Sequence, residues 1–298
     1  MRPLQSDTMT VRERVAAARQ TLSEAGIGPA EAAISARMLA EHVLGWDTTR
    51  YLTLGHEPEP SGFGERYGAV VTRRAAREPS AYITGHREFW GLPLEVSPAV
   101  LIPRPETELI VETALELFGA DPGRPLNVAD ACTGCGNLAI ALAHELDHAS
   151  IVATDISADA LAVGRKNAER HGVADRIRFI RTDVLKGIDG PFDLIVANPP
   201  YVRSEDGPAL QPEVRDHEPG VALFGGVIGT ELVAVVIEQG AARLRPGGHL
   251  LVEFGFGQEM AAEEVIAATP GLTLIGLRRD LQGLARMAIA KKLEPGAF

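Results

Sequence analysis

The sequence has only two cysteines, few aromatic residues and no long apolar segment, and each of these absences narrows what the protein can be. Cys132 and Cys135 cannot by themselves complete a structural zinc site, which needs a full tetrahedral set of ligands. No apolar run approaches the roughly 20 residues that a membrane-spanning helix requires. Residues 1–7 also lack the apolar core of a signal peptide. We therefore expect a cytosolic protein with no bound metal and no membrane partner.

The chain is acidic, with a formal net charge of −11, but this charge is unevenly distributed. Residues 1–80 contain ten arginines and ten acidic residues, so the net negative charge lies in the rest of the chain. An acidic surface repels phosphates, and an aromatic content of 5% offers few rings for stacking on bases. We therefore expect no stable nucleic-acid partner. Arg73, Arg74 and Arg77 are interpreted as a solvated helix face, with a local basic groove as the alternative.

The first 78 residues are expected to form an all-helical recognition domain. Apolar residues recur at three- and four-residue spacing from Val11 to Leu22, which predicts a first helix. A second helix is predicted around residues 33–43, and a third begins at Phe63. The apolar face predicted for the second helix consists of Ala33, Ile34, Met38, Leu39 and Val43.

A linking β-hairpin is expected at residues 79–100, because Leu92, Leu94 and Val96 alternate with other residues and glycines supply the turns. From about residue 126 strands alternate with helices, which predicts a parallel sheet with helices on both faces. The expected fold of residues 101–298 is therefore α/β: a doubly wound, seven-stranded, mostly parallel, Rossmann-like sheet. Ligands of such sheets bind at the carboxyl ends of the strands.

A glycine-rich loop, residues 130–139, joins the first strand of this sheet to its helix. Its glycines let the backbone pass close to a ligand, and the following helix presents unbonded N–H groups. Because Gly134 and Gly136 also fit the dinucleotide-binding pattern, a nicotinamide-dependent oxidoreductase is one alternative. A redox dithiol at Cys132 and Cys135 is another. The Thr-Gly between these cysteines instead favours a loop selected for its backbone shape.

Three carboxylates at strand ends favour a different ligand. Asp130, Asp155 and Asp183 end or follow the first three strands of the predicted sheet. A pyrophosphate would be repelled there, whereas the positive amino and sulfonium groups of S-adenosylmethionine would be attracted. Asp155 suits the ribose hydroxyls, and Asp183 suits the adenine amino group. The sequence thus favours S-adenosylmethionine over NAD, with simple helix caps as the alternative role of these aspartates.

The four residues Asn198-Pro199-Pro200-Tyr201 follow an apolar strand, residues 192–197. Proline lacks an N–H and cannot continue a sheet ladder, so the strand must end here and leave the amide of Asn198 free. The Asn198 side chain and the Pro199 carbonyl are then two converging acceptors, which suit a planar NH2 group. A plain strand-terminating turn is the alternative.

The chain resembles, over nearly its whole length, the glutamine N5-methyltransferases that modify peptide chain release factors. The segments that carry this resemblance are residues 79–85, 88–91, 101–110, 198–201, 213–216 and 279–283. The segment 198–201 alone is shared with adenine-N6 methyltransferases of nucleic acids. Its combination with the Ile-Pro-Arg-Pro-Glu-Thr-Glu segment that begins at Ile102 is far more specific.

The resemblance implies a class I methyltransferase fold, with S-adenosylmethionine as cofactor and S-adenosylhomocysteine as product. The helical domain would help to grip the release factor, whose Gly-Gly-Gln loop would supply the target glutamine, and we expect a monomer. With the strand-end carboxylates included, the cofactor-binding residues are Asp130, Cys132, Thr133, Gly134, Cys135, Gly136, Asp155, Asp183, Val184 and Asn198. The substrate-binding residues are Asn198, Pro199, Pro200 and Tyr201, of which Asn198, Pro199 and Tyr201 would be catalytic.

Two residues depart from the family pattern and leave alternatives open. Cys132 stands where the family usually has glycine, and its loop resembles that of enzymes that methylate a glutamine of a ribosomal protein. Phe224 stands where aspartate is more frequent, which affects the substrate loop. Glutamine methylation of a ribosomal protein and adenine-N6 methylation of nucleic acid therefore remain the alternative functions. A non-catalytic binding module is a third.

Our hypothesis is that the enzyme catalyses the reaction mainly by positioning the substrate amide. An amide nitrogen is a poor nucleophile, so Asn198 Oδ1 and the Pro199 carbonyl would each accept one amide hydrogen and aim the nitrogen at the sulfonium methyl. Tyr201 would pack on the planar amide. The sequence indicates no proton acceptor.

Overall fold

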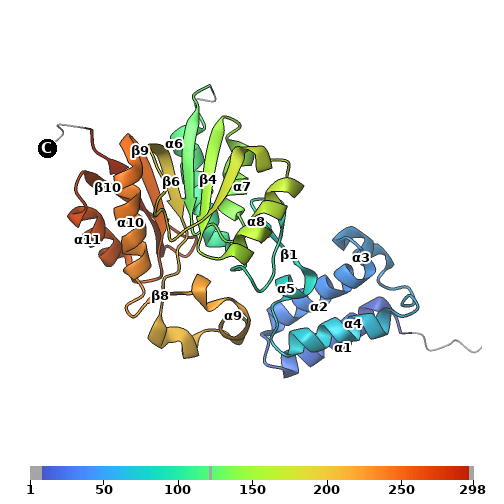
Figure 1. The fold of residues 1–298 in the computed structure, drawn as a ribbon. Helices are drawn as coiled ribbons and strands as arrows, with labels where there is room; N and C mark the ends of the chain where they lie inside the picture. The colour runs from blue at the N-terminus through green and yellow to red at the C-terminus, as the bar shows by residue number, and fades with distance from the viewer. Residues whose placement is uncertain (1–8, 121–122, 295–298) are drawn as a thin grey trace, which may run out of the picture. The chain divides into compact units, whose positions relative to one another are not determined.

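The computed structural model describes residues 9–120 and 123–294, which form two compact units. One unit extends to Gly85 and includes the later segment Gln211–His217, and the other comprises His86–Leu210 and the chain from Glu218 onward. Figure 1 shows the ribbon of both units, coloured along the chain. The boundaries expected from the sequence, at residues 78 and 100, stay a prediction.

The described residues of the first unit form helices and connecting turns, with one isolated β-bridge between Thr10 and Pro58. Its helices are α1 (Val11–Glu24), α2 (Pro29–Leu44), α3 (Thr48–Leu54), α4 (Phe63–Ala75), α5 (Ser80–Thr84) and α9 (Pro212–His217). A capping box starts α1, because the Thr10 side chain accepts from the N–H of Glu13 while Glu13 accepts from the N–H of Thr10. The predicted apolar face of α1, from Val11 to Leu22, is buried.

The apolar face predicted for α2 is confirmed at Leu39 and wrong at Ile34. Ile34 is 57% exposed, whereas the core contains Ala32, Ala36, Leu39 and Ala40. Alanines at four-residue spacing present a flat stripe on which α1 and α4 pack. The prediction was based on side-chain hydrophobicity, but the small size of the alanine side chains decides which face of α2 packs inside.

Arg74, at the end of α4, is the largest fully buried side chain among the described residues. Its guanidinium binds Glu31 at 2.6 Å and Glu213 at 2.8 Å, and Arg77 binds the second oxygen of Glu213 at 2.6 Å. Interpreting Arg74 as part of a solvated face or basic groove is therefore wrong. Its charge is neutralised inside the helical unit by a glutamate that lies 139 residues later.

The hairpin predicted between residues 79 and 100 is present in the second unit. β1 (His86–Phe89) pairs antiparallel with β2 (Leu92–Glu95). Trp90 and Gly91 connect them with φ values of 53° and 69°, the geometry of a two-residue type I′ turn.

The second unit contains the predicted seven-stranded sheet, in the order β10-β11-β9-β6-β3-β4-β5. β11 is antiparallel to both of its neighbours and the other pairs are parallel, so the mostly parallel α/β fold is confirmed. The strands are β3 (Leu126–Ala131), β4 (Ala149–Asp155), β5 (Ile177–Arg181), β6 (Phe192–Ala197), β9 (Leu244–Glu253), β10 (Leu272–Arg279) and β11 (Ala285–Lys292).

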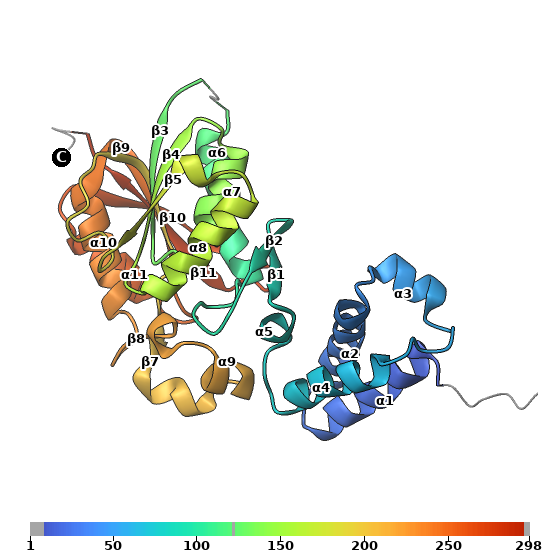
Figure 2. The same ribbon diagram turned by 45° about the vertical axis from the view of Figure 1, so that its right-hand side comes forward.

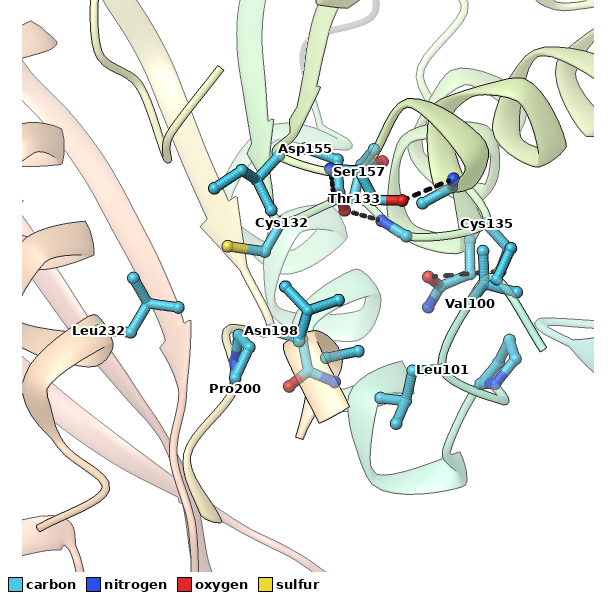
Figure 3. Close-up of a pocket in the computed structure, with 18 of the residues that line it drawn as sticks. Val100, Leu101, Cys132, Thr133, Cys135, Asp155, Ser157, Asn198, Pro200 and Leu232 are labelled. Carbon is cyan, nitrogen blue, oxygen red and sulfur yellow. Dashed lines mark hydrogen bonds between the residues drawn. The ribbon is translucent and has the colours of Figure 1, made fainter. Parts of the chain in front are cut away.

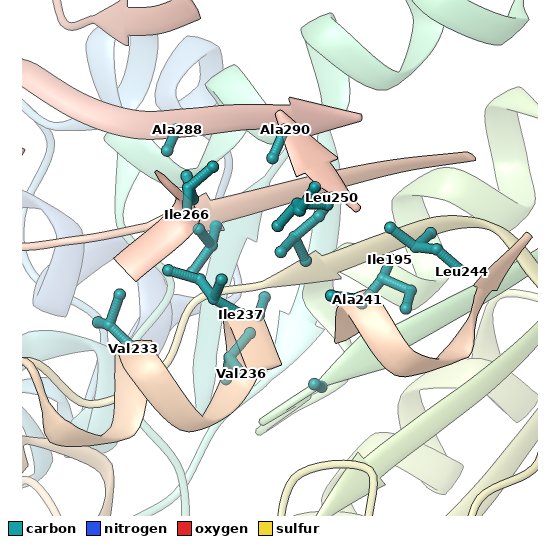
Figure 4. Close-up of a cluster of buried hydrophobic side chains, with 14 of the residues drawn as sticks. Ile195, Val233, Val236, Ile237, Ala241, Leu244, Leu250, Ile266, Ala288 and Ala290 are labelled. Carbon is teal, nitrogen blue, oxygen red and sulfur yellow. The ribbon is translucent and has the colours of Figure 1, made fainter. Parts of the chain in front are cut away.

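Helices cover both faces of this sheet (Figure 2). α6 (Glu108–Phe118), α7 (Asn137–Glu145) and α8 (Ala158–Arg170) lie on one face. α10 (Glu231–Arg243) and α11 (Glu259–Ala268) lie on the other. Figure 4 shows the core under α10 and α11, where Val236, Ile237 and Ile266 pack against Ile195 and Leu250 of the central strands. All six residues of β6 are buried, as a central parallel strand requires.

Short elements connect these layers. β7 (Val202–Arg203) pairs in parallel with β8 (Phe224–Gly226), a contact that the sequence did not predict. The 3₁₀ turns are η1 (Pro105–Thr107), η2 (Ala174–Arg176), η3 (Ser204–Ala209) and η4 (Gly220–Ala222). No helix within residues 9–120 and 123–294 is long and apolar enough to cross a membrane.

Replacing Glu213 by alanine should destabilise the helical unit, because the buried guanidinium of Arg74 loses its more buried partner. We expect the free energy of unfolding in urea to fall by about 3 kcal/mol. Arg215→Ala is the matched control, since Arg215 is exposed and pairs only with its neighbour Asp216. That control should change stability by less than about 0.5 kcal/mol. Equal effects of the two substitutions would contradict the role assigned to Arg74 and Glu213.

Candidate active site

A cavity of about 250 Å³ lies at the carboxyl ends of the parallel strands (Figure 3). Nine of the site residues predicted from the sequence line it: Cys132, Thr133, Gly134, Cys135, Asp155, Asp183, Val184, Asn198 and Pro200. Four others do not line it: Asp130, Gly136, Pro199 and Tyr201. The segments from four different strand ends thus converge on one cavity, although not every predicted residue faces it.

The glycine loop after β3 is shaped by its backbone. Cys132 and Gly134 adopt positive φ values of 60° and 56°, and Gly136 begins α7 at 84°. A Cβ on Gly136 would stand 3.1 Å from Ile140 Cδ1 and 3.4 Å from Gly164 Cα, so the loop passes close to α8. Glycine allows both the conformation and the close approach.

Asp130 lies beneath this loop and is completely buried. Its Oδ2 accepts hydrogen bonds from the Thr133 hydroxyl at 2.5 Å and from the N–H of Ala139 at 3.1 Å. Burial raises the pKa of the Asp130 carboxyl to about 7. The sequence argument placed Asp130 against the ligand, whereas in the fold its carboxyl holds the loop and the start of α7 together.

Asp155 ends β4, and its carboxylate joins the glycine loop to the start of the segment before α8. Its Oδ2 accepts from the N–H of Gly134 at 2.9 Å, and its Oδ1 accepts from the N–H of Ser157 at 2.8 Å. Burial raises the pKa of Asp155 above the ordinary aspartate value. Asp183 and Val184 line the same cavity from the segment that follows β5. These hydrogen bonds fix the Asp155 carboxylate, and Asp183 lies in the same lining.

The two cysteines are both reduced thiols. Burial raises the pKa of Cys132 and raises that of Cys135 to about 12. Redox dithiols and nucleophilic cysteines need an accessible thiolate. Since both thiols stay protonated at neutral pH, the geometry favours a loop element over a redox centre.

Asn198 follows β6 directly, and its side chain is already oriented by a hydrogen bond. Its Nδ2 donates to Thr107 Oγ1 at 2.9 Å, so the expectation that the whole amide is free is wrong. The NH2 end is occupied, and Oδ1 is the end that remains to accept a hydrogen bond. Asn198 and Pro200 lie side by side below Cys132 in Figure 3.

Tyr201 turns away from this cavity. Its hydroxyl donates to Glu253 Oε1 at 3.3 Å, and burial raises the pKa of its phenol. The Thr107 hydroxyl interacts with the same carboxyl, whose pKa burial raises to about 7. The backbone around Tyr201 is tightly packed, since a Cβ on Gly225 would stand 2.4 Å from the Pro200 oxygen. Thr107 and Glu253 were not predicted as site residues.

Several lining residues were also missed. Leu101 and Arg104 come from the segment whose motif was noted, and Ile156 and Ser157 follow Asp155. Phe224 lines the cavity as well, at the position where the family more often has aspartate. These residues could have been found from the sequence, because each lies within or next to a motif that was already recognised.

Comparisons with known proteins identify the family. The family model described as "PrmC N-terminal domain" matches residues 13–85, and "Methyltransferase small domain" matches residues 108–211. A release factor glutamine methyltransferase from Bradyrhizobium diazoefficiens is 41% identical over 99% of this chain and 100% of its own length. The chain belongs to the release factor glutamine methyltransferase family. Another member, from Nitratidesulfovibrio vulgaris, is 44% identical over 76% of this chain and 77% of its own length.

Solved structures support the fold of this family member. A methyltransferase from Pyrococcus furiosus matches with a TM-score of 0.52 at 19% identity, covering 76% of this chain and 98% of that chain. The catalytic domain of hMettl16 matches with a TM-score of 0.56 at 18% identity, covering 77% and 84%. The nicotinamide-dependent alternative is therefore set aside, because the family and fold are those of methyltransferases.

The buried carboxyl of Asp130 gives the methyltransferase a testable pH dependence. Its folded pKa, about 7, lies above that of an unfolded aspartate, so its contribution to stability is greatest at low pH and is lost as pH rises through about 7. Asp130→Asn should therefore gain stability relative to wild type by about 3 kcal/mol between about pH 5 and pH 8.5, at about 1.4 kcal/mol per pKa unit. Urea unfolding at both pH values measures this difference. A difference that does not change with pH would contradict a raised pKa at Asp130.

Proposed function

We propose that this enzyme transfers a methyl group from S-adenosylmethionine to the side-chain amide nitrogen (N5) of the glutamine in the Gly-Gly-Gln loop of peptide chain release factors. The observation that carries the proposal is the oriented side chain of Asn198 beside a cavity lined by Asp155 and Asp183. Relatives that match the chain over nearly its full length carry the corresponding name. We also propose that the enzyme acts as a monomer in the cytoplasm.

The residues of the cavity suit S-adenosylmethionine. Residues 132–136 would lie along its methionine part, Asp155 at its ribose, and Asp183 with Val184 at its adenine. Carboxylates lining the cavity attract the positive amino and sulfonium groups, and Ile156 and Leu101 offer apolar walls. When bound, the cofactor supplies an electrophilic methyl group.

The enzyme's own contribution is to hold the glutamine amide. Asn198 Oδ1 and the Pro199 carbonyl each accept one amide hydrogen, and no hydrogen bond from the described residues reaches the Pro199 carbonyl. With both hydrogens held, the nitrogen lone pair points out of the amide plane, toward a cofactor in the cavity. Positioning of this kind can contribute roughly 7–11 kcal/mol to lowering a barrier. Acceptors near the nitrogen also stabilise the positive charge that develops there. One of the two held hydrogens then leaves as a proton, through its acceptor to water.

Thr107 and Glu253 decide which end of the Asn198 amide faces the substrate. Asparagine can present either NH2 or oxygen, and a threonine hydroxyl can donate or accept. Glu253 Oε1 accepts from the Tyr201 hydroxyl, and the Thr107 hydroxyl interacts with the same carboxyl, so the Thr107 hydrogen is directed toward Glu253. The Thr107 oxygen must then accept from Asn198 Nδ2, which leaves Oδ1 for the glutamine. Thr107 is a positioning residue in this arrangement.

The reaction itself is tested by intact-mass analysis of a purified release factor incubated with the enzyme and S-adenosylmethionine. Wild-type enzyme should add the mass of one CH2 group, and a release factor with Gln→Ala in its Gly-Gly-Gln loop should gain nothing. Asn198→Ala should lower kcat by about 10²- to 10³-fold, as loss of an oriented polar contact in the transition state does. Its affinity for S-adenosylmethionine should change less.

Activity of Asn198→Ala within about threefold of wild type would contradict the acceptor role, given the size of such contacts. Absence of transfer to the release factor, with cofactor binding retained in calorimetry, would redirect the search to a ribosomal protein glutamine or a nucleic-acid adenine.

The orientation of Asn198 is tested with a pair of variants at Thr107. Thr107→Val removes the hydroxyl while keeping the shape, and kcat should fall about tenfold, the value of one hydrogen bond. Thr107→Ser keeps the hydroxyl and should retain most of kcat. Both variants should bind S-adenosylmethionine as wild type does, because Thr107 does not line the cofactor cavity. Equal kcat values for the two variants would exclude the hydroxyl as the group that orients Asn198.

A further inference from the structure

A second cavity, of about 230 Å³, lies beside Tyr201, and nothing proposed above binds in it. Its lining consists of Arg104, Glu106, Tyr201, Glu253 and Arg286. Arg104 lines the first cavity too, so the two cavities are neighbours across one side chain. Tyr201 is also the last residue of the four that begin with Asn198. A substrate that places its side-chain amide at Asn198 therefore has this second cavity directly beside it.

The guanidinium groups of the two arginines in this cavity each have N–H donors that bind no described residue. Arg104 uses Nη2 to bind Glu218 at 2.5 Å, and Arg286 uses Nε to bind Asp280 at 2.8 Å. Neither guanidinium makes another hydrogen bond to a described residue. Because a guanidinium carries five N–H groups, each arginine is held in place by one partner and retains donors.

Glu253 adds an acceptor that has no partner. The residue is 2% exposed, and its Oε2 accepts no hydrogen bond from the described part of the chain. Leaving a buried acceptor unpaired costs free energy, and a ligand that donates a hydrogen bond to Glu253 Oε2 would recover that cost. The cavity thus presents unused donors on one side and an unused buried acceptor on the other.

We propose that this second cavity binds the main chain of the substrate next to the target glutamine. A peptide backbone carries an N–H donor and a C=O acceptor at each residue, which matches the cavity's donors and acceptor. Both guanidinium groups are already paired with carboxylates, and Glu106 and Glu253 add two further carboxyls, so the cavity disfavours a phosphate and suits a neutral polar ligand. A Gly-Gly flank has no side chains, so its peptide groups can enter a cavity of this size. This inference rests on the proposed function and specifies how its substrate is held.

The test compares Arg286→Gln with Asp280→Asn in steady-state methylation of a full-length release factor. Arg286→Gln replaces the charged guanidinium donors by a shorter, neutral amide, and KM for the release factor should rise about 10- to 100-fold, the range for hydrogen bonds to a charged group. Asp280→Asn weakens the same ion pair but leaves the guanidinium, so its KM should stay within about threefold of wild type. Affinity for S-adenosylmethionine should be unchanged in both variants.

Equal losses in the two variants would show that Arg286 matters only through its ion pair and would overturn the inference. An unchanged KM in Arg286→Gln would overturn it as well. Failure of the proposed function has a different signature, since the wild-type enzyme would then bind S-adenosylmethionine and leave the release factor unmethylated. That result would remove the basis of the inference together with the proposed function.

Discussion

The register of the parallel strands is the constraint on which this site depends. Ala131 of β3 pairs with Ala197 of β6 and with Thr154 of β4, and Ala197 pairs with Val252 of β9. The residues that come next along each strand are therefore level with one another at the edge of the sheet. These residues are Cys132, Asn198, Asp155 and Glu253. A slip of one residue in any pairing would move a functional side chain to the opposite face.

Much of the fold and part of the site could be predicted from the sequence, because the end of each strand, where the site residues lie, is marked by local sequence patterns. β6 is a short apolar run that two prolines follow after Asn198, a local pattern that can be recognised without knowledge of neighbouring strands. The position of Asn198 follows from that pattern alone. The direction of its amide does not, because it depends on Thr107, which lies 91 residues earlier. Asp130 was assigned to the ligand for a similar reason. The sequence places a carboxylate at the end of a strand, but it does not show whether that carboxylate faces a cavity or the start of a helix.

The helical unit shows the same limit of local patterns. Three arginines near the end of α4 have the composition of a solvated face, yet Arg74 is buried because Glu31 and Glu213 neutralise it. Only a segment that returns from the methyltransferase half of the chain supplies the second carboxylate. Pairing of this kind favours one position of residues 211–217 over all others, because separating the charges inside the unit is costly. The ion pairs thus hold residues 211–217 in the helical unit, although in the sequence these residues lie between Asn198 and Phe224.

The close packing of Gly225 has a consequence for how this enzyme can diverge. A Cβ at this position would stand 2.4 Å from the backbone oxygens of both Pro200 and Gly229, so every side chain is excluded there on steric grounds. Phe224, its neighbour, is 37% exposed and has no such restriction. A substitution in this loop is therefore sterically tolerated more readily at position 224, which lines the cavity, than at position 225. The wall of the cavity can change at one residue while the backbone beside it stays in place.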